Sequence, residues 1–249
     1  MSLLQSITTG KTDLPPRVVI QGENGVGKSS FGAGTPNPIF VQTEDGLGQL
    51  PVSKFPLAAT FDDAMSQLAA VRDEPHEFRT VVVDSLDWLE RLIFDKVCNQ
   101  FGASNIEKAD GGYGRGYVHA LGHWRKFLAL LDEIRARRRM VVLLISHTKV
   151  ERVENPEGPA YDRYCPRLHK LAAALVCEWC DIIGFATRRM RVDKESGKAT
   201  PIGADGGQRI LRCIGGPACV AKSRYALPAE IELSWNALVD AIGKGAARG

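Results

Sequence analysis

The chain has 249 residues, of which 44% are hydrophobic and 24% are charged, as in an ordinary soluble globular protein. It has no run of about 18 apolar residues, which excludes a membrane-spanning helix and a membrane partner. The first residues lack the basic start and apolar core of a secretory signal, so a cytoplasmic location is expected. The net charge of +3 is too small to indicate a nucleic-acid partner by itself. Basic clusters at 135–139 and 188–191 fit nucleic-acid contacts or solvated surfaces.

Six cysteines occur in a chain without secretory features, which favours reduced thiols over a disulfide framework. Cys177 and Cys180, with Cys213 and Cys219 further along, have a spacing that a zinc site can use. Cys177 and Cys180 lie within an apolar run, however, so burial in the core is the favoured interpretation.

Residues 1–16 are expected to form a short N-terminal lead and residues 17–249 a single domain. Short apolar runs rich in β-branched residues predict buried strands at 17–22, 38–44, 79–85 and 139–147. Between them, apolar residues repeat at three- and four-residue steps and predict helices at 61–74, 86–102 and 119–138.

Strands that alternate with helices predict an α/β fold, in which helices cover a mainly parallel sheet. The carboxyl ends of parallel strands share one edge of the sheet, and ligands bind at that edge. Gly25, Glu44, Asp84 and His147 each lie at or just after the end of a predicted strand. We therefore expect these four residues to meet along one crevice.

The segment G-E-N-G-V-G-K-S follows the first strand at 22–29 and matches the phosphate-loop (Walker A) pattern G-x-x-x-x-G-K-[ST]. The backbone N–H groups of such a loop converge on phosphate oxygens at the start of a helix. Lys28 is expected to reach the β- and γ-phosphates of ATP and Ser29 to bind Mg²⁺. The residues expected to hold the nucleotide are Gly22, Glu23, Asn24, Gly25, Val26, Gly27, Lys28, Ser29 and Ser30.

Asp84 ends the third predicted strand and brings a carboxylate to the ligand edge, where it suits a role in binding Mg²⁺. The alternative role is an N-cap of the next helix, for which Ser85 is also suited. Many phosphate-loop motor ATPases have a water-activating glutamate directly after this aspartate, but here the residue is Ser85. The catalytic base must therefore come from elsewhere.

Glu44 follows the second strand and is the candidate base that would orient or deprotonate water beside the γ-phosphate. Its alternative is an ordinary loop acid next to Asp45. His147 ends the fourth strand and is the candidate sensor of the γ-phosphate. A histidine at a strand end is also often only a satisfied polar residue.

After His147 the sequence becomes polar and contains proline, which predicts a long loop over 149–170. An apolar run at 171–186 follows. A C-terminal β-hairpin is expected from 182–193 and 208–216 around a turn-rich segment at 194–207, and a final helix from 234–245.

The order of the motifs "GENGVGKS", "IFVQTEDG", "TVVVDS" and "VVLLISH" resembles the RecA-like recombinase core. More narrowly, the chain looks like phage-encoded RecA-like ATPases that anneal single-stranded DNA. The resemblance implies a RecA-like P-loop fold with ATP and Mg²⁺ as cofactors, Glu44 as the catalytic glutamate, Asp84 as the Walker B acid, and the cytoplasm of a bacterial host as the location. His147 stands where recombinases have a glutamine.

The resemblance also places DNA-facing loops at 102–117 and 149–168. Mobile glycines in the first of these surround Tyr113 and Tyr117, which offer stacking faces, and Arg115, which offers a phosphate contact. A flexible loop without a ligand is the alternative. Lys222 and Arg224 lie where recombinases present cations to the ATP of a neighbouring subunit.

These features predict a DNA-stimulated ATPase that assembles as a homo-oligomer on single-stranded DNA and promotes annealing or recombination. A single-strand DNA-binding protein is the expected protein partner. Two alternatives remain open: a hexameric motor of the same fold, such as a helicase or packaging ATPase, and a nucleotide-gated interaction module with little turnover. The lack of a guanine-reading motif argues against a GTPase.

Overall fold

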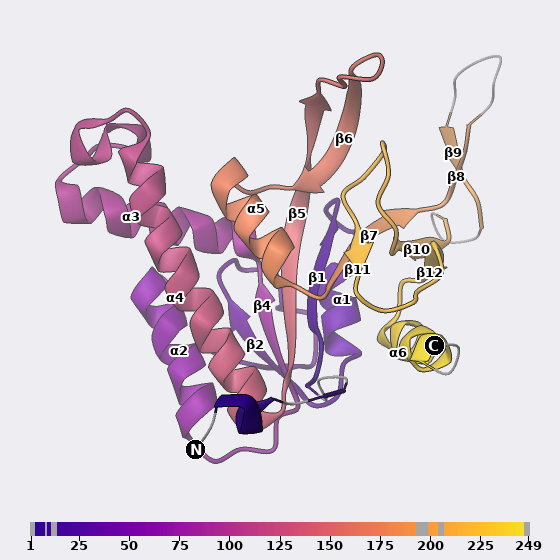
Figure 1. The fold of residues 1–249 in the computed structure, drawn as a ribbon, viewed down its shortest axis with the longest axis horizontal. Coiled ribbons are helices and arrows are strands. Elements are labelled where there is room, and N and C mark those ends of the chain that lie inside the picture. Colours follow the sequence, from indigo (N-terminus) through magenta and orange to yellow (C-terminus); the bar gives the residue numbers. More distant parts are fainter. Residues whose placement is uncertain (1–2, 8, 11–13, 193–198, 204–206, 247–249) are drawn as a thin grey trace.

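The computed structural model describes residues 3–7, 9–10, 14–192, 199–203 and 207–246. Figure 1 shows a central sheet with helices on both of its faces. The helices are η1 (Leu3–Ser6), α1 (Lys28–Ala33), α2 (Phe61–Asp73), α3 (Leu86–Phe101), η2 (Ile106–Gly111), α4 (Arg115–Arg138), α5 (Lys170–Trp179) and α6 (Trp235–Ala246). The strands are β1 (Arg17–Gly22), β2 (Pro38–Gln42), β3 (Ser53–Lys54), β4 (Thr80–Asp84), β5 (Val141–Val153), β6 (Tyr161–Pro166), β7 (Ile182–Arg188), β8 (Met190–Val192), β9 (Ala199–Pro201), β10 (Arg209–Arg212), β11 (Lys222–Ser223) and β12 (Glu230–Glu232).

The strands of the main sheet follow the order β12-β10-β7-β1-β5-β4-β2-β3. The pairs from β7 to β3 are parallel, whereas β10 and β12 extend the sheet in the antiparallel sense. The predicted α/β fold with a mainly parallel, helix-covered sheet is therefore confirmed. The four predicted strands and three predicted helices are all present, although α4 begins at Arg115 rather than at residue 119.

Alternating side chains of the strands build two separate cores. Val81 and Val83 of β4 pack on the side of α2, α3 and α4, whereas Val82 between them packs with Phe31 of α1 and Trp235 of α6. Figure 1 shows these helices on opposite faces of the sheet. Because both faces are covered, the strands are continuous apolar runs, which is why they are recognisable from the sequence.

The prediction of a long loop over 149–170 is wrong. β5 continues to Val153 and pairs antiparallel with β6, so that this hairpin projects from the sheet (Figure 1). Its strands alternate charged residues with residues such as Val150 and Tyr164, because only part of the hairpin packs on the protein, where Tyr164 stacks on Phe185. A half-solvated hairpin of this kind has the same polar composition as a loop.

The predicted C-terminal hairpin is confirmed, since β7 and β10 pair antiparallel. Its connection contains the small β8–β9 ladder, and the expected turn at 194–207 lies partly outside the described residues.

The cysteines are free thiols, with Cys180 in one core and Cys213 in the other. Across the described ranges no group of three or more metal-ligating side chains is found. No helix in the described part of the chain has the length and apolarity needed to cross a membrane.

Candidate nucleotide-binding site

The phosphate loop joins β1 to α1 at the carboxyl end of the central strand. Gly25 and Gly27 have φ angles of 73° and 106°, which side-chain-bearing residues rarely adopt. A Cβ on Gly22 would lie only 2.5 Å from the carbonyl oxygen of Ala186 on β7, so only glycine fits there. Val26 anchors the loop in the core, while Glu23, Asn24 and Ser30 remain exposed.

Lys28 is buried and its Nζ lies inside the loop, where it donates to the carbonyl oxygens of Gly22 at 3.0 Å and Glu23 at 2.9 Å. Burial lowers the pKa of Lys28, although the nearby carboxylates of Asp84 and Glu44 oppose that shift. The ammonium group is thus already positioned where phosphate oxygens would replace the loop carbonyls as acceptors.

Ser29 and Asp84 come together as predicted, with Ser29 Oγ donating to Asp84 Oδ2 at 2.7 Å. Asp84 is 4% exposed, and burial raises its pKa although the hydrogen bond from Ser29 and the charge of Lys28 oppose the shift. A hydroxyl and a carboxylate oxygen are the hard ligands that Mg²⁺ prefers. The two side chains therefore fit a Mg²⁺ site, with Ser85 and not Asp84 at the N-cap position of α3.

Glu44 and His147 face each other across the carboxyl ends of β2 and β5, with 3.8 Å between Glu44 Oε1 and His147 Nε2. Glu44 keeps 21% of its side chain exposed. Partial burial raises the pKa of Glu44, and His147 opposes the rise while Asp84 and Asp87 add to it. Of the predicted strand-end residues, Glu44 thus lies beside His147, and Asp84 lies beside Ser29 of the phosphate loop.

Asp87 belongs to this site but was not predicted from the sequence. It lies in the first turn of α3, is 3% exposed, and places its carboxylate against His147. Both carboxylate oxygens are 3.1 Å from His147 Nδ1, and the backbone N–H of His147 donates to Oδ1. A carboxylate only accepts, so the contact with Asp87 favours a proton on Nδ1, although Arg167 Nη2 also lies 3.2 Å from this nitrogen. Nε2 is directed toward Glu44.

Arg167, also not predicted, completes the cluster from the residue that follows β6. Its Nε donates to Asp87 Oδ2 at 3.1 Å and its Nη2 contacts the same oxygen. Burial alone would raise the pKa of Asp87, but the hydrogen bonds from His147 and Arg167 outweigh it and keep that pKa well below its usual range. Asp87 is therefore ionised, and it links His147 to the end of the β5–β6 hairpin.

Two arginines on the other side of the loop were also missed. Arg188, in the basic cluster at 188–191, donates through Nη2 to the carbonyl oxygen of Gly25 at 3.4 Å. Arg209 at the start of β10 lies against Gly27, where a Cβ would come 2.9 Å from its Nη1. No motif marks these residues, since only the β7–β10 pairing brings them to the loop.

Of the three predicted DNA contacts, Tyr113 lies in the turn between η2 and α4, whereas Arg115 and Tyr117 lie in the first turn of α4. Tyr113 is 99% exposed and offers an open aromatic face. Arg115 makes a weak contact, 3.4 Å from its Nη1 to the carbonyl oxygen of Asp110. Tyr117 differs from the prediction, because its ring stacks on His169 with 3.9 Å between centroids and meets the edge of Phe94. One face of Tyr117 is thus used inside the protein.

Lys222 and Arg224 lie at the opposite edge of the sheet from their own phosphate loop, beside the amino-terminal end of β7. Lys222 Nζ donates to the carbonyl oxygens of Cys177 and Glu178. Arg224 donates to the Asp181 carboxylate at 3.0 Å and to the Glu178 carbonyl at 3.0 Å. Within one chain both cations therefore cap the carboxyl end of α5, and a role at a neighbour's ATP stays a prediction.

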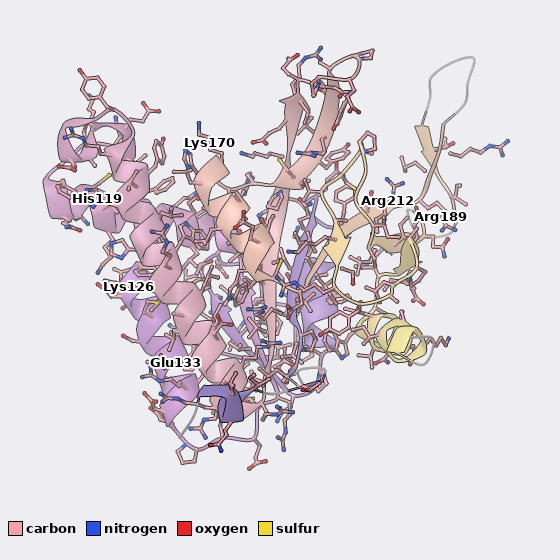
Figure 2. All side chains as sticks on the ribbon, viewed as in Figure 1. His119, Lys126, Glu133, Lys170, Arg189 and Arg212 are labelled. Carbon is pink, nitrogen blue, oxygen red and sulfur yellow. The ribbon has the colours of Figure 1, made fainter. Side chains whose placement is uncertain are left out.

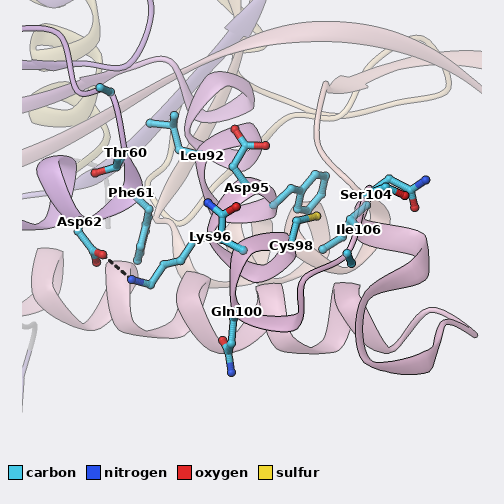
Figure 3. Close-up of a pocket in the computed structure, with 15 residues that line it drawn as sticks. Thr60, Phe61, Asp62, Leu92, Asp95, Lys96, Cys98, Gln100, Ser104 and Ile106 are labelled. Carbon is cyan, nitrogen blue, oxygen red and sulfur yellow. Dashed lines mark hydrogen bonds and ion pairs between the residues drawn. The ribbon is translucent and has the colours of Figure 1, made fainter.

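A large groove lies away from the phosphate loop. A groove of about 1080 Å³ runs between the start of α2, the outer face of α3 and the segment leading to η2 (Figure 3). Its rim carries the Lys96–Asp62 ion pair at 2.5 Å, and Thr60 starts α2 with a capping box. The groove contains none of the strand-end residues Glu44, Asp84 and His147. The size of a cavity therefore does not identify the candidate nucleotide site in this protein.

A phosphate loop, a hydroxyl–carboxylate pair and an acid at the end of a neighbouring strand together define a P-loop NTPase. A family model described as an AAA domain (AAA_24) matches residues 14–225, and the chain belongs to this family. The SPbeta prophage-derived uncharacterized protein YorG of Bacillus subtilis (strain 168) is 24% identical over 170 residues, covering 67% of this chain and 49% of that protein. The chain thus spans about half the length of this relative.

Proposed function

We propose that the protein is a Mg²⁺-dependent ATPase that binds single-stranded DNA and promotes its annealing or recombination. The observation that carries the ATPase part is the meeting of Glu44 with His147, 3.8 Å apart, beside the Ser29–Asp84 pair. The AAA-domain match supports a nucleotide as ligand. The prophage origin of YorG, as its name gives it, supports a phage setting for this chain.

Each residue of the site would have its own role in ATP hydrolysis. Lys28 would hold the β- and γ-phosphates, and Ser29 with Asp84 would hold Mg²⁺, which supplies charge neutralisation on the phosphates. Glu44 would accept the proton of the attacking water, a role that its raised pKa favours because catalysis is best when the base titrates closer to the working pH. His147, whose ring is held by Asp87, would lie beside the γ-phosphate.

The DNA part of the proposal is supported by the position of two projecting segments. The tip that connects α3 to α4, with Tyr113, and the β5–β6 hairpin both extend beyond the carboxyl edge of the sheet (Figure 1). Arg167 joins the hairpin to Asp87 and so to the nucleotide site. We further propose a homo-oligomer on DNA, with Lys222 and Arg224 acting in trans, and a single-strand DNA-binding protein as partner.

The charge of these segments favours a second candidate function. The hairpin region 149–166 contains three basic and four acidic residues, which are Lys149, Arg152, Arg163, Glu151, Glu154, Glu157 and Asp162. Lys149 is paired with Glu151 at 2.6 Å. A hairpin without excess positive charge suits a protein partner, so a nucleotide-gated interaction module is the alternative.

A binding titration with single-stranded DNA tests the proposal. Wild type should bind an oligonucleotide at low salt, more tightly with ATP, and with a shallow salt dependence because few phosphate contacts are available. Tyr113→Ala should weaken binding by about 1–3 kcal/mol through loss of base stacking, whereas Leu57→Ala, also exposed, should not. Absence of DNA binding with and without ATP, together with normal ATP binding, would favour the interaction module.

A further inference from the structure

A second cavity, of about 160 Å³, lies directly beside the phosphate loop between α1 and the start of α6. Gly27 and Ser30 of the loop region form one wall, Arg209 of β10 forms another, and Trp235 and Asn236 of α6 close it. An adjoining hollow of about 500 Å³ shares Trp235 and Asn236. The cavity is too small for a whole nucleotide, since pockets that enclose a drug-sized ligand have roughly 300–1,000 Å³.

The cavity lies on the side of the loop away from the hydrolytic residues. In the strand order, β5, β4 and β2 carry His147, Asp84 and Glu44 on one side of β1, whereas β7 and β10 lie on the other. A phosphate loop cradles the α- and β-phosphates with its backbone while its lysine reaches the γ side. A nucleotide whose γ-phosphate lies near Glu44 therefore extends its nucleoside toward β10 and this cavity.

Among the described residues, no acid pairs with Arg209. Within the described ranges, its guanidinium makes no hydrogen bond and no ion pair, although it lies against Gly27. The nearby Arg189 and Arg212 (Figure 2) both bind Glu230, at 2.8 and 3.2 Å. An unpaired guanidinium on the wall of a cavity offers a planar cation that stacks on an aromatic ring.

The α6 side of the cavity supplies a rigid floor and a polar group. Trp235 is buried and meets Phe31 of α1 edge-on at 6.0 Å, which fixes the start of α6 against α1. Asn236 is exposed at the rim, and in the described part of the chain its amide makes no side-chain hydrogen bond. An amide offers a donor and an acceptor, as the edge of an adenine base also does.

We propose that this cavity, together with the adjoining hollow, binds the adenine base and ribose of the nucleotide, with Arg209 stacked on the base and Asn236 at its edge. The inference rests on the proposed ATPase function, because it assumes that the phosphate loop holds a nucleoside triphosphate. In this proposal, Arg209 lets the protein distinguish a nucleotide from a bare polyphosphate, and Asn236 lets it distinguish adenine from other bases.

Isothermal titration calorimetry with Mg²⁺ tests this inference, using ATP, GTP and inorganic tripolyphosphate as ligands. Arg209→Ala should weaken ATP binding about 5- to 30-fold, as expected for loss of one stacked cation, and change tripolyphosphate binding less than about 2-fold. Arg212→Ala on the same strand is the matched control and should bind all three ligands as wild type does. Asn236→Ala should narrow the preference for ATP over GTP by about 3- to 10-fold. Circular dichroism checks that each variant is folded.

Equal weakening of ATP and tripolyphosphate in Arg209→Ala would overturn the inference, because Arg209 would then contact only phosphate. Unchanged ATP binding in that variant would overturn it as well. Failure of the wild type to bind ATP would instead remove the proposed function on which the inference rests. If wild type binds ATP normally and neither substitution has an effect, the inference about the cavity fails while the proposed ATPase function stands.

Discussion

His147 Nδ1 lies 3.1 Å from both carboxylate oxygens of Asp87, and the backbone N–H of His147 donates to the same carboxylate. Asp87 thus holds both the ring and the main chain of a residue at the end of β5. Because Arg167, at the base of the β5–β6 hairpin, also binds Asp87, one buried carboxylate joins the nucleotide site to that hairpin.

Replacement of Asp87 by asparagine should impair hydrolysis without preventing nucleotide binding. Asparagine keeps one acceptor oxygen but lacks the charge that fixes the protonated Nδ1, so His147 loses its fixed tautomer and orientation. We expect kcat to fall about 100-fold, the scale of a small misplacement of a reacting group, with KM for ATP nearly unchanged. Steady-state ATPase assays give both constants.

The matched control for Asp87→Asn is Asp62→Asn, which alters an exposed acid on α2 that pairs with Lys96. Its kcat should equal that of wild type. Long-range ¹H–¹⁵N spectra should show His147 protonated at Nδ1 in wild type and in a mixture of tautomers in Asp87→Asn. An unaltered tautomer together with unaltered kcat would contradict the positioning role of Asp87.

Glu90 should make the stability of the protein depend on pH. It is buried in α3, and its carboxylate oxygens accept the backbone N–H of His169 at 3.1 and 2.9 Å. Burial raises the pKa of Glu90 to about 7, against an ordinary value of 4.5, while the His169 N–H opposes the rise. The folded chain therefore holds a proton that the unfolded chain releases.

A raised carboxyl pKa stabilises the folded state fully below the ordinary pKa, and this contribution is lost as pH rises through the folded pKa of about 7. The loss amounts to about 3 kcal/mol of unfolding free energy between pH 4.5 and pH 8. Urea denaturation should show it in wild type and in the control Glu178→Gln, an exposed acid, but not in Glu90→Gln. Identical pH dependence in Glu90→Gln would count against the assignment.

Gly22→Ala should destabilise the fold at the phosphate loop. The added Cβ would meet the Ala186 carbonyl oxygen at 2.5 Å, which forces β1 and β7 apart at their ends. We expect a loss of about 1–3 kcal/mol of unfolding free energy, as for other overpacked sites. Urea titration measures it, and Gly216→Ala, where a Cβ meets nothing within 4 Å, should change stability far less.

The strand-end residues were predictable because buried parallel strands are continuous apolar runs that stop where the polar residue begins. Glu44, Asp84 and His147 could be placed together on that basis alone. Asp87 could not, because an acid in the first turn of a helix is expected anyway for its interaction with the helix dipole. The one feature of the sequence that pointed to Asp87 as a site residue was its position three residues after Asp84.

The β5–β6 hairpin and the arginines of the carboxyl edge show where sequence patterns are insufficient. The hairpin is partly solvated, so its composition is that of a loop, and Arg167 only acquires a role once β6 is folded back on β5. Tyr117 looked like an exposed stacking residue among glycines, but α4 begins early enough to bury one face of its ring on His169. Such contacts depend on tertiary packing rather than on local pattern.

The most direct test of the account is single-turnover hydrolysis of ATP by wild type and by Glu44→Gln, with and without single-stranded DNA. Glutamine keeps the size of the side chain but cannot accept the proton of the attacking water. We predict that Glu44→Gln binds ATP as wild type does and hydrolyses it about 10²- to 10⁴-fold more slowly, with no stimulation by DNA. Wild-type hydrolysis rates in Glu44→Gln would contradict the assignment of Glu44 as the base and with it the proposed mechanism.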